Sequence, residues 1–391
     1  MEWAGEVPPE LIQVCGFGCD GSRGHYRDLL WNDDMLDDVV AQSYLIGFLG
    51  ADWWGSDARA TGAELRRLGH LLIERHYEDH FPTRWRHNVL RATRRLLRPL
   101  MEADYNRAVS ELLQVEGMDF LLVFKGMLLR PETLRQFRER QIPTYCVYPD
   151  VSFRDHGRNI WDCLPLYDCV FTTKSFHLLD SSLKQHLRRL ELVPHGFDQE
   201  VHRRITASPS MQSTYGCDVS FVGAWSPKKE SLIAELIARL PEVDLRIWGP
   251  SWGHAADVVR KRWQGRGAWG DELAAIYGCS RINLGLLSEA GTGTRSGDLT
   301  TARTWQIPAS GGFMLHEHST ELVESFIPNQ EVGVFSGGED LVRQVRIWLQ
   351  DDAVRTAVMQ RGHERAHRDR YTYARAVEAV LRVHREAGKQ R

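Results

Sequence analysis

The stretch DVSFVGAWSPKKESLIAELIARLPEVDLRIWGP, residues 218–250, decides the fold class. It contains a short apolar run that ends at Gly223, a helical segment at 228–240 and a second apolar run at 243–250. Short apolar runs bounded by turn residues are typical of buried parallel strands, and such strands alternate with helices in α/β domains. The stretch therefore predicts a strand–helix–strand unit of an α/β domain.

The same alternation continues on both sides of this stretch. After it, further strands are predicted at 281–287, 313–317 and 331–336. Before it, a first series predicts strands at 44–50, 71–75, 118–124, 142–150, 168–174 and 190–198. Residues 199–216, between the two series, are polar and weakly periodic, which is typical of an interdomain linker. We therefore expect two Rossmann-like domains that face a central cleft.

The domain boundaries follow from these two series. Residues 1–42 show no sustained period and are treated as an N-terminal extension. The first Rossmann-like domain is then predicted at 43–198, the linker at 199–216, the second domain at 217–370, and a helix that crosses back to the first domain at 371–391.

A basic helical stretch lies inside the first domain. It spans residues 86–115, and Pro99 predicts a break within it. Its segment Arg86–Arg98 is interpreted as a solvated face. Contact with an anionic acceptor or with a membrane surface is the alternative.

The composition excludes several classes of protein. The chain has 391 residues with 49 basic and 52 acidic side chains, a net charge of −3, which argues against nucleic acid as a partner. No apolar run approaches the roughly 20 residues of a transmembrane helix, and the N-terminus does not have the pattern of a signal peptide. The 7 cysteines include no C-x-x-C pair and indicate reduced thiols. We therefore expect a cytoplasmic protein with no transmembrane segment.

The richest candidate site is DLTTARTWQIPASGGFMLHEH, residues 298–318. Asp298 stands where a helix N-cap is expected, and Arg303 and Gln306 are neighbours on the helix that follows. Gly311 and Gly312 allow a sharp turn into the next strand. A helix N-terminus with an arginine beside a glycine-rich loop is a natural phosphate site. The alternative is an ordinary connection with a solvated arginine.

These residues carry a family resemblance. The segment RTWQIPASGGFML, 303–315, resembles the Arg-x-Phe-Glu-Ile-Pro-Ala-x-Gly-x-Phe-Leu-Leu signature of the CgeB-like (spore maturation protein B) glycosyltransferases, which are relatives of GT-B family 4. Further similar segments occur in the expected order at 192–202, 218–236, 272–286 and 334–373. The resemblance covers about residues 43–381, and its C-terminal motifs are the specific ones.

The resemblance implies a two-domain GT-B fold, no metal or other cofactor, and a nucleotide-sugar donor bound by the second domain. The glutamate pair of family 4 corresponds to Asp298 and Gln306, so the second glutamate is replaced by an amide. The family's Gly-Arg and Lys correspond to Gly223-Ala224 and Lys229, so the arginine is missing. The resemblance thus implies a donor site made of Gly223, Lys228, Lys229, His195, Asp298, Arg303, Gln306, Gly311 and Gly312.

The acceptor side is expected in the first domain. The loop GADWWGSDARATG follows the first strand, and its Trp53 and Trp54, near Asp57, could stack on a sugar or pack between domains. Asp150 ends a predicted strand, where it could act as a general base or shape a turn. His195 could contact the donor or be a structural residue.

The sequence thus predicts a metal-independent glycosyltransferase. Arg303 and Lys229 would stabilise the leaving diphosphate, with Asp150 as a third catalytic candidate. The acceptor, whether glycan, lipid, protein or small molecule, and the stereochemical outcome are left open. The alternatives are a nucleotide-sugar epimerase of the same fold and a non-catalytic nucleotide- or sugar-binding protein derived from a transferase.

Overall fold

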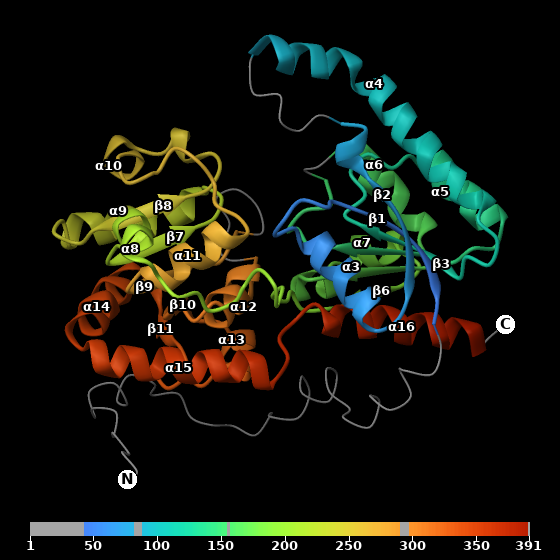
Figure 1. Cartoon of the computed structure of the whole chain (residues 1–391). Coiled ribbons are helices and arrows are strands. Elements are labelled where there is room, and N and C mark those ends of the chain that lie inside the picture. The colour runs from blue at the N-terminus through green and yellow to red at the C-terminus, as the bar shows by residue number, and fades with distance from the viewer. Residues whose placement is uncertain (1–42, 82–87, 155–156, 290–296, 390–391) are drawn as a thin grey trace.

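The computed structural model describes residues 43–81, 88–154, 157–289 and 297–389. The predicted N-terminal extension 1–42 therefore lies outside the described residues, as do 290–296. Two parallel β-sheets, each flanked by helices, form two lobes that stand side by side (Figure 1). The prediction of two Rossmann-like α/β domains is confirmed.

The first sheet has six strands in the order β2-β1-β3-β4-β5-β6, and every neighbouring pair is parallel. The strands are β1 Leu45–Gly50, β2 Leu71–His76, β3 Phe120–Phe124, β4 Thr144–Tyr148, β5 Cys169–Thr172 and β6 Leu190–Leu192. The helices of this lobe are α3 Asp57–Arg67, α4 Asn88–Ser110, α5 Pro131–Glu139, α6 Arg158–Cys163 and α7 Ser181–His186, with short 3-10 turns η3 Tyr77–Asp79, η4 Glu111–Gln114, η5 Leu164–Leu166 and η6 Ser175–Leu179.

Side chains of the first sheet alternate between two apolar cores, because successive residues of a strand point to opposite faces. In β3, Phe120 and Leu122 belong to the core that α3 covers, whereas Leu121 and Val123 belong to the core beneath α4 and α5. All four are fully buried. This two-sided burial is why the strands read as nearly continuous apolar runs.

The second sheet has five strands in the order β11-β10-β9-β7-β8, again all parallel. The strands are β7 Val219–Val222, β8 Leu245–Trp248, β9 Ile282–Gly285, β10 Met314–Glu317 and β11 Gly333–Phe335. The accompanying helices are α8 Pro209–Tyr215, α9 Pro227–Arg239, α10 Asp257–Arg260, α11 Asp271–Cys279, α12 Ala302–Ala309, α13 Thr320–Ser325, α14 Gly337–Gln350 and α15 Asp352–Arg368, with the 3-10 turn η7 Trp252–His254.

The chain returns to the first lobe at its C-terminal end. Helix α16, Ala374–Lys389, packs against α3, and its Val377, Val380 and Leu381 are buried in the core of the first sheet (Figure 1). Phe197 pairs with Thr372 where the two crossings of the chain meet. The two lobes are therefore joined by two separate segments.

Two local features differ from the sequence expectations. The break expected at Pro99 is wrong, because α4 continues through this residue. A proline inside a helix removes one hydrogen bond and can kink the helix without ending it. Within 199–216, residues 209–215 form α8, whose N-cap is Ser208 and whose first residue is Pro209.

Two further findings bear on the class of protein. In the described residues, no helix is both long enough and apolar enough to cross a membrane. The described cysteines, Cys146, Cys163, Cys169, Cys217 and Cys279, are all buried free thiols.

Candidate functional site at the facing strand ends

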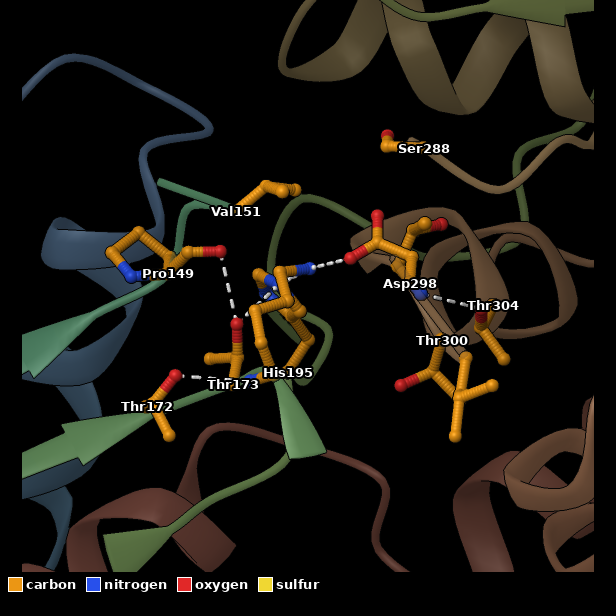
Figure 2. A network of polar contacts seen from close by, with 12 residues as sticks. Pro149, Val151, Thr172, Thr173, His195, Ser288, Asp298, Thr300 and Thr304 are labelled. Atoms are coloured by element: carbon orange, nitrogen blue, oxygen red, sulfur yellow. Dashed lines mark hydrogen bonds and ion pairs between the residues drawn. The ribbon is translucent and has the colours of Figure 1, made fainter. Parts of the chain in front are cut away.

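The carboxyl ends of the two sheets meet at a buried ion pair. Lys174 follows β5 of the first sheet, and its Nζ lies 2.7 Å from Oδ1 of Asp298, which lies in the connection between β9 and α12. Both side chains are buried, with 5% and 2% of their surface exposed. Figure 2 shows Thr173 and His195 from the first lobe facing Asp298 and Ser288 from the second. Ligands of open α/β sheets bind beyond the carboxyl ends of strands, which is where this pair lies.

Arg303 sits in the first turn of α12 and reaches back to the ends of β7 and β9. Its guanidinium donates to the carbonyl of Leu286 at 2.7 Å and to that of Val222 at 3.4 Å. Its Nε is buried and has no hydrogen-bond partner among the described residues. Burial lowers the pKa of Arg303, but an arginine remains charged at any ordinary pH. The site therefore contains a partly buried guanidinium whose Nε–H has no hydrogen-bond partner among the described residues.

Lys229, in the first turn of α9, is the second cation of the site, and it is buried. Its Nζ donates to the carbonyl of Ala224 and to Ser288 Oγ, both at 3.2 Å. Burial and the neighbouring charge of Arg303 lower its pKa to about 7. Among the described residues, neither Lys229 nor Arg303 forms an ion pair with a carboxylate. Unpaired buried charge is costly, so this corner of the site is electrostatically suited to an anion.

Lys228 is placed differently from its neighbour. Its Nζ lies 2.5 Å from Glu317 Oε1 at the end of β10, so its charge already has a partner. The other oxygen of Glu317 accepts a hydrogen bond from the backbone N–H of Leu287. Lys228 therefore lies beside Lys229, but its own charge is already balanced by Glu317.

Gly223 directly follows β7 and lies next to the Arg303 guanidinium. A Cβ at this position would come within 2.8 Å of Arg303 Nη1 and of a ring carbon of Phe221. The missing side chain thus allows the guanidinium to lie against the strand end. The Phe221 ring lies 5.3 Å from the Arg303 guanidinium carbon, within cation–π range.

The start of α12 is not where the sequence indicated. The N-cap is Thr301, not Asp298, and the backbone N–H of Thr301 donates to Thr304 Oγ1 at 3.0 Å. Several polar residues precede Arg303, and each could cap a helix, so the sequence alone does not single out Thr301. Asp298 is freed from this task and pairs with Lys174 instead.

Gln306, Gly311 and Gly312 lie further along α12 and beyond it. Gln306 is one turn after Arg303 and is buried. Gly311 has φ +71° and, with Gly312, ends the helix, because their N–H groups bond to the carbonyls of Pro308 and Ile307. A helix between parallel strands runs antiparallel to them, so these glycines lie at the amino end of β10. The structure therefore does not bring Gly311 and Gly312 close to the charged groups of Lys229 and Arg303.

His195, after β6, lies between the two lobes. Its Nε2 is 3.0 Å from Thr173 Oγ1 and 3.5 Å from Lys174 Nζ. Burial, together with the charge of Lys174, lowers its pKa to about 3, against the opposing effect of Asp298 and Asp150. His195 is therefore neutral at physiological pH and touches the lysine that joins the lobes.

A cavity of about 220 Å³ opens in the first lobe beside this region. Its polar lining includes Asp57, Lys125 and Asp150. Its lining side chains also include Trp53, Tyr77, Tyr105, Phe124, Met127 and Leu128. Lys125 Nζ lies 2.5 Å from Asp150 Oδ2, and Tyr373, just before α16, donates a hydrogen bond to Asp57. Burial raises the pKa of Asp57. The cavity has the mixed aromatic and polar lining that small-molecule sites use.

Trp53 and Trp54 both lie against the second lobe. The rings of Trp53 and Trp269 are 6.2 Å apart and nearly perpendicular. Trp54 lies so close to Gly270 that a Cβ there would meet its ring at 2.4 Å. Both tryptophans remain partly exposed. The loop therefore packs between the lobes, which is one of its two interpretations from the sequence. Trp53 also lines the cavity.

Sequence reasoning missed Lys174, Lys125 and Thr173. Lys125 and Lys174 directly follow strand ends, at β3 and just after β5, so the rule that selected Asp150 and His195 could have selected them too. The pairing of Lys174 with Asp298 could not be found that way, because the two residues are distant in sequence and belong to different lobes. Within the described ranges, no cluster of three or more His, Cys, Asp or Glu side chains could hold a metal ion.

Comparisons with known proteins agree with this architecture. Residues 228–382 match a family model described as Glycosyl transferase-like. No curated protein sequence is similar enough to count as a match. The specific CgeB-like assignment therefore stays a prediction.

Solved structures resemble the chain along nearly its whole length. Sucrose-phosphate synthase from Thermosynechococcus elongatus is 12% identical, with a TM-score of 0.59 over 89% of this chain and 100% of that one. A glycosyltransferase from Rickettsia africae is 11% identical, with a TM-score of 0.56 over 88% and 98%. HepE from Anabaena in complex with UDP-glucose is 12% identical, with a TM-score of 0.55 over 87% and 99%. The chain has the two-domain GT-B fold of these glycosyltransferase structures.

Proposed function

We propose that the protein is a glycosyltransferase that moves a sugar from a nucleoside-diphosphate sugar to a hydroxyl group of an acceptor. The observation that carries the proposal is a pair of cations at the carboxyl edge of the second sheet, buried Lys229 and partly buried Arg303. Among the described residues, neither has a carboxylate partner. A diphosphate supplies the missing negative charge. The similarity of residues 228–382 to glycosyl transferases supports the same choice.

In this proposal the donor and the acceptor occupy different lobes. The diphosphate lies against Lys229, Arg303 and the backbone at Gly223, with Lys228 at its border. The acceptor enters the 220 Å³ cavity of the first lobe, lined by Trp53, Asp57 and Asp150. The sugar would then lie near the Lys174–Asp298 contact, with neutral His195 beside it.

The proposed chemistry follows from the growth of charge on the leaving group. As the bond between the anomeric carbon and the phosphate oxygen breaks, negative charge accumulates on the diphosphate, and fixed cations stabilise it most in the transition state. The acceptor oxygen forms the new bond to the anomeric carbon. Its proton passes to a carboxylate, for which Asp150 in the acceptor cavity is our candidate. Lys229 and Arg303 would stabilise the charge of the leaving diphosphate, which a metal ion does in other enzymes. Metal independence stays a prediction. The cytoplasmic location stays a prediction too.

The test is a binding and turnover measurement with UDP, GDP, dTDP, ADP and CMP and their sugars. The UDP compounds come first, because HepE shares the fold and was solved with UDP-glucose. One nucleoside diphosphate should bind, and its sugar should be slowly hydrolysed without acceptor. Binding without any hydrolysis would favour a non-catalytic binding protein. Conversion of the donor sugar to an epimer without acceptor would identify an epimerase instead.

A further inference from the structure

We propose that the first half of α4, here taken as residues 88–100, is a docking surface for an anionic lipid bilayer. The helix has two different halves. In its second half, Tyr105 and Val109 are buried in the core of the first lobe. Its first half extends along the outside of the lobe, away from the sheet (Figure 1). This proposal does not depend on the proposed sugar transfer.

Large apolar side chains are exposed on this first half. Leu96 is 80% exposed and Leu100 is 68% exposed. Four positions apart in a helix, they lie on the same face. An isolated exposed leucine needs no explanation, but a helix that projects two from one face offers them to an apolar partner.

Two described arginines, Arg95 and Arg98, lie on other faces of the same turns. Residues 88–100 contain Arg91, Arg94, Arg95 and Arg98 and no acidic residue. Arg95 is exposed, and Arg98 is half-exposed and pairs with Glu102 at 2.7 Å. At 3.6 residues per turn, Arg95 and Arg98 point well away from the face that holds Leu96 and Leu100. A helix with leucines on one face and arginines on the other is suited to lie in the headgroup region of an anionic membrane.

Other occupants fit less well. Nucleic acid would use the arginines but has no use for the paired leucines, and the net charge of the chain is −3. A second copy of the same surface would bring two arginine-rich segments together. An anionic bilayer satisfies both the leucines and the arginines at once.

The position of α4 connects this surface to the cavity of the first lobe. Tyr105 lines that cavity. It follows Leu100 by five positions, about 7.5 Å along the helix axis. A bilayer bound to the first half of α4 would therefore lie close to the wall of the cavity.

The experiment measures binding of the full chain to sucrose-loaded vesicles by sedimentation. Vesicles of phosphatidylcholine with about one quarter phosphatidylglycerol are compared with pure phosphatidylcholine at physiological ionic strength. We expect clear binding only to the anionic vesicles. Leu96→Asn/Leu100→Asn should lower the partition coefficient by about tenfold or more. Arg95→Gln/Arg98→Gln should lower it by about fivefold per arginine and weaken its salt dependence.

Matched controls use exposed residues elsewhere in the first lobe. Leu71 and Leu179 are 64% and 84% exposed, so Leu71→Asn/Leu179→Asn removes two exposed leucines away from α4. Arg135 and Arg158 form exposed ion pairs like that of Arg98, so Arg135→Gln/Arg158→Gln removes equivalent charges. Both controls should bind vesicles as the unchanged chain does. Thermal melting verifies that every variant is folded.

Three results would overturn the proposal. The first is the absence of binding to anionic vesicles by the unchanged chain. The second is an equal loss of binding in the α4 variants and in the controls. The third is binding of a short DNA duplex that is tighter than vesicle binding, depends on Arg95 and Arg98, and is unaffected by the leucine substitutions.

Discussion

Lys174 Nζ and Asp298 Oδ1 lie 2.7 Å apart and join the carboxyl ends of the two sheets. Both groups are buried, so each depends on the other for the stability of its charge. His195, beside Lys174, is neutral and adds no competing charge. The pair therefore holds the two lobes together between the proposed donor and acceptor sites.

Breaking this pair should destabilise the protein strongly. Lys174→Met leaves the Asp298 carboxylate buried without its partner, and we expect the free energy of unfolding to fall by about 3–5 kcal/mol. Adding Asp298→Asn removes the unpaired charge and should recover a large part of that loss. Urea denaturation of the two single variants and the double variant gives the coupling energy. Additive effects of the two substitutions would show that the residues do not act as a pair.

Much of the fold was predictable from the sequence because its signals are local. Apolar runs such as FLLVF at 120–124 are buried on both faces of a parallel sheet, so strand positions could be read directly. Gly223, Lys229 and Arg303 lie together because each follows a strand end of the same sheet or begins a helix there. Their role as donor-binding residues stays a prediction.

Other features were not predictable because they depend on direction or on distant partners. Gly311 and Gly312 are near Arg303 in sequence, but α12 carries them to the opposite edge of the sheet. The contact of Lys174 with Asp298 joins the two lobes, and no local sequence pattern predicts it. Pro99 does not end α4, because the helix continues into turns held by Tyr105 and Val109.

Removing the Arg303 guanidinium should weaken nucleotide binding. Arg303→Ala loses a charge-assisted hydrogen bond to the diphosphate, about 1.5–3 kcal/mol, or roughly ten- to a hundredfold in affinity. Arg303→Lys keeps the charge but not the planar fork and should recover only part of the affinity. Isothermal titration calorimetry with the nucleoside diphosphate that binds best measures the effect.

The control for this prediction is an exposed arginine of the same lobe. Arg346→Ala, on the outer face of α14, should leave the affinity unchanged. Arg303 also holds the carbonyls of Val222 and Leu286, so thermal melting must show that the Arg303 variants are folded. Unchanged affinity in folded Arg303→Ala protein would place the nucleotide elsewhere.

Nucleotide binding should be accompanied by proton uptake at Lys229. Burial and Arg303 lower the pKa of this amine to about 7, so it is largely neutral at about pH 8. A bound diphosphate favours the ammonium form and raises the pKa. Calorimetry in two buffers of different ionisation enthalpy should reveal uptake of up to about one proton near pH 8. Lys229→Arg should abolish it, because arginine is charged throughout. Uptake that persists in this variant would assign the proton to another group.

The same pKa has a consequence for stability without ligand. In the unfolded chain Lys229 titrates near its ordinary value of about 10.4, so between about pH 7 and pH 10 the unfolded state binds more protons than the folded state. The contribution of Lys229 to the free energy of unfolding therefore rises with pH across this window. Comparing urea midpoints of the unchanged chain and Lys229→Met at several pH values isolates that contribution. A difference between the two that does not change with pH would show that Lys229 titrates normally.

Gly223→Ala should act through Arg303. The new methyl group would lie within 2.8 Å of Arg303 Nη1 and of the Phe221 ring, so the guanidinium must move away from the strand end. We expect the nucleotide affinity to fall about as much as in Arg303→Ala. The free energy of unfolding should fall less than it does when a core substitution leaves a cavity. Because both substitutions remove the same contact, their effects should not add: Gly223→Ala should cost little further affinity in an Arg303→Ala background. Calorimetric affinities for the two single variants and the double variant complete the cycle. If the two losses add in full, Gly223 contributes to the nucleotide site independently of the guanidinium above it.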